Sequence, residues 1–512
     1  MEIPAMLKKI TILRFLILFF WSQMLLANTD VTTALRNQIN ILEQQQTLPI
    51  ENEKITAATG LLANIYKIRQ YAAVWAHPEQ VKTLASNIET IDQDGLSSND
   101  YHLQGITKLR QKIAENQGNA NENQANLDIL LSNALLRLVY HLTYGKIDPY
   151  SLDPNWNFSR KFIDGDPVSL FNKVLASNST LADYIFQLRN QGTYHKFLKV
   201  SLKQYRALKI NGGWPVIPEG GTLKPGAQDS RIPLIHQRLM ITGDIQSPAP
   251  DESIYTAELV AGIKKFQDRH VLESDGIIGK KTLAAMNITV SARIDQIRAN
   301  LERSRWVSQD IHGKFVIVNI AGFQAYLVED KKIIWHSKVQ VGKAYRQTPV
   351  FKDTITYIDI NPTWTVPPTI LKQDILPKLR KDPGYLKRKN MVVLDHQGNN
   401  IDIASINWDK VTGRNFRHMI RQQPGPSNAL GRIKIMFPNK HAVYLHDTPS
   451  KKKFNKSERA FSSGCIRVQK PFELAELLLG NSEKWNLESL NKIVETEKLT
   501  RIKLPKSIPV LV

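Results

Sequence analysis

Hydrophobic positions in the first half of the 512-residue chain recur at helical spacing. The clearest runs lie between residues 55 and 75 and between 127 and 142, where apolar side chains fall on one helix face. The segment 115–126 between them is rich in Asn, Gln and Glu, which predicts an exposed loop. Residues 28–228 are therefore expected to form a mainly helical domain that ends in a stretch rich in Gly and Pro.

A compact unit of three short helices is expected at residues 229–289. Leu259, Ile263 and Phe266 are spaced so that they share the apolar face of its second helix. A turn that contains glycine follows, and a closing helix is expected after it. The run Phe266-Gln267-Asp268-Arg269-His270 and the turn after it resemble the three-helix peptidoglycan-binding module. An unrelated helical linker is the alternative interpretation.

Beyond residue 311 the hydrophobic pattern changes from helical to strand-like spacing. The expected strands are short, rich in Val, Ile and aromatic residues, and lie at 315–320, 323–328, 333–341, 355–360, 433–437 and 442–445. A charged segment with helical spacing, 369–421, interrupts them, and we interpret it as a cap over the sheet. Residues 311–480 are therefore expected to form a mostly-β domain, and 481–512 to complete either this domain or the helical one. The whole chain is expected to be an α+β multidomain protein.

The formal net charge of +21 favours polyanionic partners such as nucleic acid, anionic lipid or an acidic cell wall. Lys8 and Lys9 precede an apolar run at 10–26, which is the layout of an export signal. Residues 1–27 are expected to be a cleaved signal peptide or, because the run approaches the roughly 20 residues that span a bilayer, a membrane anchor. A packed N-terminal helix is the third interpretation. Export argues against nucleic acid as a partner and leaves the membrane surface and the cell wall.

Cys465 is the only cysteine of the chain, so it cannot form an internal disulfide. On its own it is either an inert buried residue or a reactive thiol. His446 precedes it with 18 residues between them. A free thiol titrates near about 8.5, so an imidazole that takes its proton would activate it. Spacing alone is a weak argument for this pair.

The residues around Cys465 fit such chemistry. Gly464 allows a close backbone approach to a substrate or a positive φ, and the amides after this turn could face an oxyanion. Arg467 would share a strand face with Cys465, where it could lower the pKa of the thiol or hold a carboxylate. The twelve histidines include no HExxH pattern, and neither a metal nor a cofactor is expected.

The segments Tyr444–Pro449 and Arg459–Val468 resemble the catalytic motif of L,D-transpeptidases, in particular the large multidomain branch of Gram-negative bacteria. The run 361–368 also fits this branch. Its members combine a helical scaffold, a peptidoglycan-binding module and a mostly-β catalytic domain with a helical cap, so the likeness covers nearly all of the mature chain. The resemblance implies that Cys465 is the nucleophile and His446 the general base and acid.

The resemblance also implies roles for neighbouring residues. Gly464 is expected to shape the nucleophile turn, and the backbone of Asp447 to orient the imidazole. Substrate contacts or cleft walls are expected from Arg467, Ser463, Tyr444 and Trp364. Two positions depart from the pattern of smaller relatives, because Ser463 stands where many have histidine and Asp447 where many have glycine.

By resemblance, the reaction is a two-step acyl transfer in the periplasm. Cys465 attacks the carbonyl of the third residue of a donor tetrapeptide stem, releases D-Ala and forms a thioester, which an amine of an acceptor stem resolves into a 3→3 cross-link. Carbapenems are expected to acylate the same thiol. The alternatives are hydrolysis as an L,D-carboxypeptidase, attachment of a lipoprotein to the wall, and a non-catalytic wall-binding scaffold. The sequence leaves open the oligomeric state and whether the protein stays anchored in the inner membrane.

Overall fold

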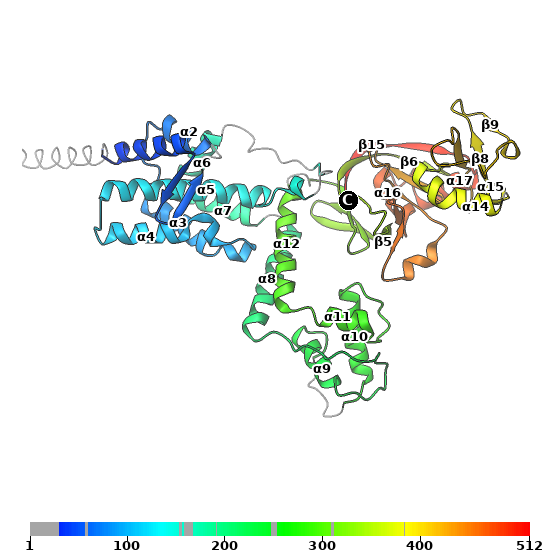
Figure 1. Ribbon diagram of the computed structural model, residues 1–512, viewed down its shortest axis with the longest axis horizontal. Coiled ribbons are helices and arrows are strands. Elements are labelled where there is room, and N and C mark those ends of the chain that lie inside the picture. Colours follow the sequence, from blue (N-terminus) through cyan, green and yellow to red (C-terminus); the bar gives the residue numbers. More distant parts are fainter. Residues whose placement is uncertain are drawn as a thin grey trace, which may run out of the picture. The chain divides into compact units, whose positions relative to one another are not determined.

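The computed structural model describes residues 30–56, 60–152, 156–157, 167–190, 192–246, 253–308, 312–382 and 384–512 (Figure 1). The expected signal or anchor at 1–27 lies outside these residues. Within the described ranges, no helix is both long and apolar enough to cross a membrane. Contacts divide the chain into two compact units: the first comprises 1–148, 159–212 and 289–310, and the second 149–158, 213–288 and 311–512. The finer domain limits expected from the sequence stay predictions.

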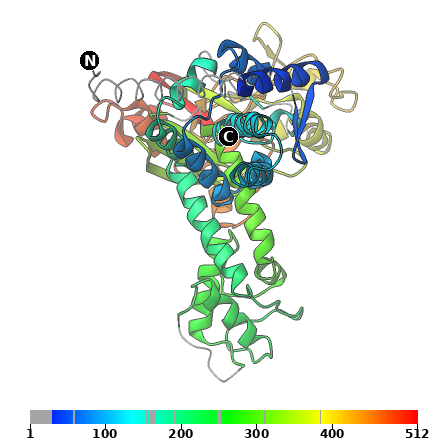
Figure 2. The same ribbon diagram turned by 90° about the vertical axis from the view of Figure 1, so that its left-hand side faces the viewer.

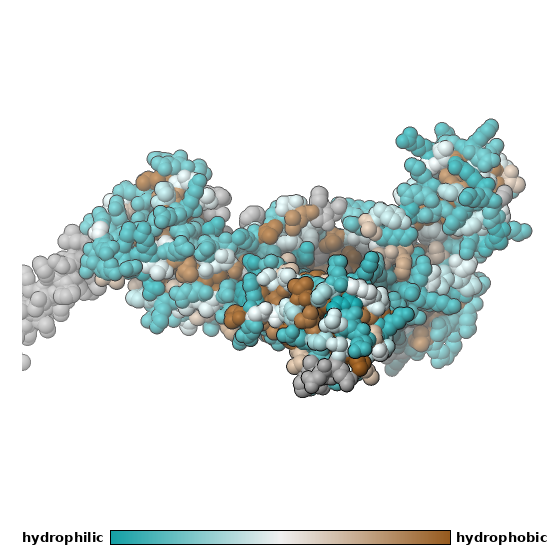
Figure 3. Space-filling view, turned by 60° about the horizontal axis from the view of Figure 1, so that its bottom comes forward, coloured by the Kyte–Doolittle hydropathy of each residue, from teal (hydrophilic) through white to brown (hydrophobic). Residues whose placement is uncertain are grey.

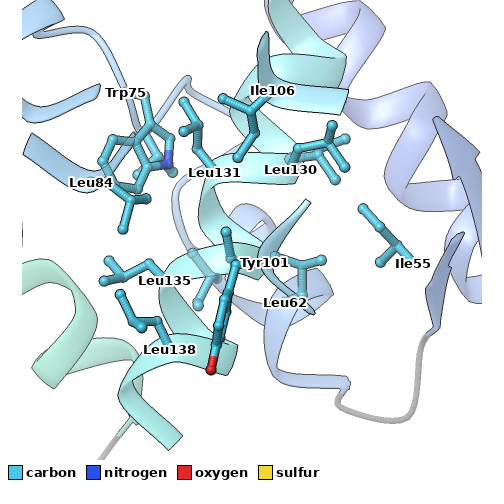
Figure 4. Packing of buried hydrophobic residues seen from close by; sticks show 14 of the residues in the cluster. Ile55, Leu62, Trp75, Leu84, Tyr101, Ile106, Leu130, Leu131, Leu135 and Leu138 are labelled. Atoms are coloured by element: carbon cyan, nitrogen blue, oxygen red, sulfur yellow. The ribbon is translucent and has the colours of Figure 1, made fainter. Parts of the chain in front are cut away.

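The first unit is mainly helical, as expected, and contains one small hairpin. Its labelled helices are α2 (Gly60–Ile68), α3 (Pro78–Glu89), α4 (Leu103–Ala114), α5 (Ala120–Tyr144), α6 (Pro167–Val174), α7 (Asn178–Arg189), α8 (Thr193–Ile210) and α12 (Val290–Ser308), and its hairpin pairs β1 (Thr47–Ile50) with β2 (Glu53–Thr56). Helix α5 runs through the core, where Leu130, Leu131 and Leu138 are buried with Trp75 and Leu84 (Figure 4).

Helix α5 begins at Ala120, inside the segment 115–126 that polar composition assigned to a loop. The loop prediction is therefore wrong for residues 120–126. The side chain of Asn119 accepts hydrogen bonds from the backbone N–H groups of Asn121 (3.0 Å) and Glu122 (3.2 Å) and so caps the helix. Asn is favoured both in loops and at such caps, so its abundance alone does not separate the two.

Helices α8 and α12 of the first unit lie side by side (Figures 1 and 2). Nδ1 of His195 on α8 is 2.8 Å from Oγ of Ser304 on α12, in a buried contact. In the sequence, residues 213–288 of the second unit follow α8 and precede α12. This segment is therefore inserted between two paired helices.

Residues 213–288 contain the three expected helices, α9 (Ile232–Ile241), α10 (Ala257–Arg269) and α11 (Lys280–Met286). They enclose a separate apolar core that includes Phe266. The side-chain amide of Gln267 accepts a hydrogen bond from Gly276 N (2.9 Å) and donates one to Ile277 O (2.9 Å). These two bonds tie α10 to the turn that follows it.

The remainder of the second unit is built on a sheet that closes on itself. Its strands are β3 (Phe315–Asn319), β4 (Gln324–Glu329), β5 (Lys332–Gly342), β6 (Lys352–Ile360), β11 (Ile433–Met436), β12 (Leu445–His446), β13 (Ala460–Ser462), β14 (Ile466–Val468) and β15 (Thr500–Leu511). Their order is β13-β5-β14-β12-β11-β6-β15-β3-β4, and a further pairing of β4 with β5 closes the ring. Helices α16 (Pro471–Leu479) and α17 (Leu487–Glu495) contribute buried leucines to its core.

The strand expected at 442–445 is shorter and shifted, because β12 comprises Leu445 and His446. Ala442 has a positive φ of 52°, which interrupts extended backbone. The side chain of Asn439 holds the residues before β12 in a turn, since its Oδ1 accepts hydrogen bonds from His441 N (3.0 Å) and Val443 N (3.1 Å). The apolar pattern of this segment gives no sign of the turn.

The insertion, residues 369–421, contains helices as expected and also strands that the hydrophobic pattern did not predict. In and beside it lie α13 (Pro368–Ile370), the π-helical turn η4 (Leu371–Ile375), α14 (Leu376–Lys381), α15 (Tyr385–Arg388), the 3₁₀ turn η5 (Ile403–Ser405), and a sheet with the order β7 (Trp364–Thr365), β10 (Met419–Gln422), β8 (Met391–Leu394), β9 (Asn400–Ile401). These strands are too short to give a periodic signal. The insertion has its own apolar core. The face of the insertion seen at the right-hand end of Figure 3 is mainly hydrophilic, in agreement with eleven Lys and Arg against five Asp and Glu in its sequence.

Candidate active site

Two short parallel strands bring the predicted nucleophile and base together. Strand β12 pairs with β14, so that Leu445 lies beside Ile466 and His446 beside Arg467. Leu445 and Ile466 are fully buried in the core of the closed sheet. Because side chains alternate along a strand, Tyr444, His446, Cys465 and Arg467 are directed to the opposite face. The predicted shared face of Cys465 and Arg467 follows from this register.

A row of polar residues continues across the neighbouring strands on the same face. Lys434 of β11 lies beside His446, Asp359 of β6 lies beside Lys434, and Arg501 of β15 lies beside Asp359. Arg501 donates two hydrogen bonds to the Asp359 carboxylate, at 2.7 and 3.0 Å, and this carboxylate is buried. On the other side, Arg467 Nη1 donates to Oε1 of the buried Gln340 at 3.3 Å. This polar row crosses six strands.

Cys465 is half-buried. Sγ lies 3.6 Å from the carbonyl oxygen of Ala442, to which it donates. Burial raises the pKa of the thiol, whereas hydrogen bonds with Tyr444 and the charges of Lys434 and Arg467 act in the opposite direction. Arg467 thus has the expected sign, but burial is the larger effect. The thiol is therefore protonated at neutral pH in the absence of a substrate.

His446 is 3% exposed. Burial, followed by the charge of Arg467, lowers the pKa of the imidazole to about 3, so the ring is neutral and able to accept a proton at neutral pH. Polar backbone groups of Asp447 and Leu430 act in the opposite direction. Among the described residues, Nδ1 of the ring is buried without a hydrogen-bond partner. Cys465 and His446 are both among the described residues, and no hydrogen bond joins the thiol to the imidazole.

Tyr444 lies between the thiol and the surrounding cations and aromatic rings. Its ring packs edge-on against His446, with centroids 5.6 Å apart, and the Lys434 ammonium is 4.3 Å from its centroid. Burial raises the pKa of the phenol, the charge of Cys465 and a hydrogen bond with the thiol raise it further, and a hydrogen bond with Trp364 opposes them. Tyr444 therefore lies beside the thiol and Trp364 beside Tyr444, and their expected contacts with a substrate stay predictions.

The turn before the nucleophile is fixed by its backbone. Gly464 has a φ of +120°, a region that disfavours residues with a side chain. Its N–H donates to Ser462 Oγ (3.1 Å), and its carbonyl accepts from the hydroxyl of Thr348 (2.7 Å). The same hydroxyl accepts a hydrogen bond from Gly342 N at 2.9 Å, which joins the turn to the end of β5.

Known family models match three parts of the chain. Residues 313–495 match the family model described as the L,D-transpeptidase catalytic domain. The chain carries an L,D-transpeptidase catalytic domain. Residues 60–202 match a scaffold domain and residues 228–286 a peptidoglycan binding domain, so all three expected parts of the chain are present.

Individual relatives cover parts of the chain. Over 215 residues it is 37% identical to a Haemophilus influenzae protein named "Putative L,D-transpeptidase". The match covers 42% of this chain and 43% of that protein, so the chain spans less than half the length of this curated relative. Crystal structures of L,D-transpeptidases from Stackebrandtia nassauensis (17% identity, 58% of this chain, 96% of that one, TM-score 0.21) and Xylanimonas cellulosilytica (13%, 57%, 98%, 0.17) are also similar.

In the transpeptidase domain, the side chain of Asp447 has a structural role that the sequence analysis did not foresee. Its Oδ2 accepts a hydrogen bond from Arg432 N (3.0 Å), and its Oδ1 forms an ion pair with Lys451. The carboxylate also packs directly over Gly431, where a β-carbon would clash with it. The backbone of Asp447 contacts the imidazole, and its role in orienting the ring stays a prediction.

The sequence analysis did not predict several residues that surround the candidate site. Lys434 could have been found, because Ile433 and Ile435 alternate with it and place it on the opposite face to the core. Thr348 and Arg346 lie in the loop between β5 and β6 and reach the nucleophile turn from more than 110 positions away. No local pattern marks such contacts. Arg346 Nη1 donates to Oγ of Ser463 at 2.7 Å, so Ser463 is engaged within the protein itself.

Proposed function

We propose that this protein is a peptidoglycan L,D-transpeptidase that forms 3→3 cross-links through a thioester on Cys465. The observation that carries the proposal is the placement of Tyr444, His446, Cys465 and Arg467 on one face of two paired strands. The matched catalytic and peptidoglycan binding domains support a peptidoglycan substrate and an extracellular or periplasmic location.

In the first step, His446 takes the proton of the Cys465 thiol while the sulfur attacks the carbonyl carbon of the third residue of a donor tetrapeptide stem. The C–N bond to D-Ala then breaks, and His446 returns the proton to the departing amine. D-Ala leaves and a thioester remains. Because the thiol has a raised pKa and His446 a lowered one, both groups are neutral before the substrate binds, and the proton moves during the attack.

In the second step, an amine of an acceptor stem attacks the thioester carbonyl. His446 accepts the proton of this amine, the C–S bond breaks, and the sulfur leaves as a thiol after it regains the proton. An amide between the two stems is the product. When water replaces the amine, the same intermediate gives a trimmed stem with a free carboxylate, which is the carboxypeptidase outcome.

Lys434 and Arg467 supply positive charge beside the reacting atoms. Among the described residues, Lys434 forms no ion pair, and Arg467 donates to the neutral side chain of Gln340. Both cations therefore remain available for negative charge on the sulfur, on the tetrahedral intermediate, or on the carboxylate of the departing D-Ala.

The test is intact-protein mass spectrometry of the wild type and Cys465→Ala after incubation with tetrapeptide muropeptides. We expect a thioester adduct and cross-linked dimers with the wild type and neither with Cys465→Ala. His446→Gln should form the adduct at least about a hundredfold more slowly, the usual range for loss of a general base.

Other results of this experiment would identify one of the three alternative functions. An adduct that yields trimmed monomers without dimers would identify an L,D-carboxypeptidase. Dimers only with a lipoprotein lysine as the acceptor would identify an enzyme that attaches proteins to the wall. If no adduct forms and the wild type still binds peptidoglycan, the protein is a non-catalytic scaffold.

A further inference from the structure

Arg346 connects the nucleophile turn of the closed sheet with the insertion, two parts that have separate apolar cores. It lies in the loop between β5 and β6, and its side chain is 13% exposed. Nη1 donates to Oγ of Ser463 (2.7 Å) and to Oδ2 of Asp374 (2.6 Å), and Nη2 donates to Oε1 of Gln373. One guanidinium therefore holds three acceptors.

The acceptors belong to different structural bodies. Ser463 lies two residues before Cys465 in the nucleophile turn, whereas Gln373 and Asp374 lie on the π-helical turn η4 of the insertion. The insertion packs around its own apolar core, separate from that of the closed sheet. A π-helical turn is rare and is often found at functional sites. Here it presents two consecutive side chains to the same guanidinium.

The contact is partly buried, because the side chain of Arg346 is 13% exposed and that of Asp374 is 42% exposed. The guanidinium is largely withdrawn from water, and charge-assisted hydrogen bonds of this kind are about twice as strong as neutral ones. Removal of Arg346 would leave Asp374 without its counter-charge and Ser463 without a donor. Among the described residues, the Arg346 guanidinium contacts neither the Cys465 thiol nor the His446 imidazole. Its effect on the acylation rate therefore passes through Ser463.

We propose that Arg346 is a positioning residue that holds the turn Ser463-Gly464-Cys465 in its reactive geometry only while η4 of the insertion is bound to the same guanidinium. The inference rests on the proposed function, because it concerns the thiol of the proposed acyl transfer. A substrate that displaces η4 would loosen the nucleophile turn, and one that leaves η4 in place would keep the turn aligned. The insertion thereby acts on the nucleophile without touching it.

The matched test compares two Asp→Asn changes in the insertion. Asp374→Asn removes the carboxylate that binds Arg346, whereas Asp382→Asn removes a carboxylate that pairs with Arg388 inside the insertion. For Asp374→Asn, we expect faster hydrogen exchange at the backbone amides of residues 463–466 and an acylation rate at saturation about tenfold lower, with KM within about twofold. For Asp382→Asn, both quantities should stay near those of the wild type.

Arg346 variants complete the test. Arg346→Ala should lower the acylation rate at least as much as Asp374→Asn, and Arg346→Lys should restore part of it. In the Arg346→Ala background, Asp374→Asn should have no further effect, because the partner is already absent. Alkylation of Cys465 by iodoacetamide should stay within about twofold in all variants, since a small reagent does not need an aligned turn.

Unchanged exchange at 463–466 in Asp374→Asn, or equal effects of Asp374→Asn and Asp382→Asn, would overturn the inference. The exchange measurement needs no enzymatic activity. A wild type that forms no thioester would therefore contradict the proposed function, while the exchange comparison would still decide whether η4 and the nucleophile turn are coupled.

Discussion

The ammonium of Lys434 lies 4.3 Å from the centroid of the Tyr444 ring, and the charge of Cys465 acts on both side chains. Burial lowers the pKa of Lys434, and the charges of Asp359 and Cys465 oppose that shift. The lysine and the cysteine therefore stabilise each other's charged forms. The charge of protonated Lys434 lowers the pKa of the Cys465 thiol, although burial, the larger effect, keeps that pKa above its usual value.

Lys434→Gln should therefore raise the pKa of the Cys465 thiol. We expect the pH midpoint of iodoacetamide alkylation to move upward by about one unit, which corresponds to about 1.4 kcal/mol. Lys452→Gln removes an equal charge from the exposed loop near the site and should leave the midpoint unchanged. Equal shifts in the two variants would mean that only the net charge of the domain matters.

His446 should make the stability of the domain depend on pH. Its folded-state pKa is lowered to about 3, so between this value and about 6.5 the unfolded chain binds a proton that the folded chain does not. Its contribution is complete above pH 6.5 and decreases as the pH falls, by at most about 1.4 kcal/mol per unit. His446→Gln should remove this slope when unfolding is followed in urea at pH 7 and pH 4.5, and the exposed His336→Gln should retain it. The variant comparison is needed because burial also lowers the pKa of His141 and His195, each to about 4.

Thr348→Val should weaken the nucleophile turn. The valine has a similar shape, but it leaves Gly464 O and Gly342 N without their hydrogen-bond partner in a buried position. We expect a loss of about 1–3 kcal/mol in unfolding free energy and slower acylation of Cys465. Thr348→Ser keeps the hydroxyl and should retain most of both. If serine proved as damaging as valine, methyl packing rather than hydrogen bonding would be the reason.

Gly464→Ala tests whether backbone conformation or space requires glycine. A β-carbon there would lie 3.7 Å from the nearest heavy atom, Gln347 O, so there is room for it. The φ of +120° is the obstacle, and we expect a cost of about 1–3 kcal/mol together with reduced acylation. Gly279→Ala, where φ is −94° and no atom lies within 4 Å, is the matched control and should be tolerated.

The sequence predicted those parts of the fold that are encoded locally. The spacing of Leu259, Ile263 and Phe266 located a helix, and alternation at 433–437 located a strand. Predictions went wrong where polar side chains decide the backbone. Asn119 starts a helix inside an expected loop, and Asn439 makes a turn within an expected strand.

The candidate site divides in the same way. Cys465 and His446 were predicted because the two short segments that contain them resemble the L,D-transpeptidase motif, and strand alternation placed Arg467 on the face of Cys465. The charges and hydroxyls that surround them come from Asp359, Lys434, Thr348 and Arg346, which are distant in sequence and meet only through strand register and loop packing. The raised pKa of the thiol also depends on burial, which no residue pattern reveals.

Strand β15 (Thr500–Leu511) lies between β6 and β3, so it separates two strands that precede it in the sequence by well over a hundred residues. Until it is synthesised, β3 and β6 have no partner along these edges and the ring stays open. Asp359 also has no Arg501 to pair with until then, because Arg501 lies on the same strand, β15. A nascent chain can therefore contain Cys465 and His446 before the surface that arranges them exists. Assembly of the site therefore depends on strand pairings of long sequence separation, and such contacts are slow to form.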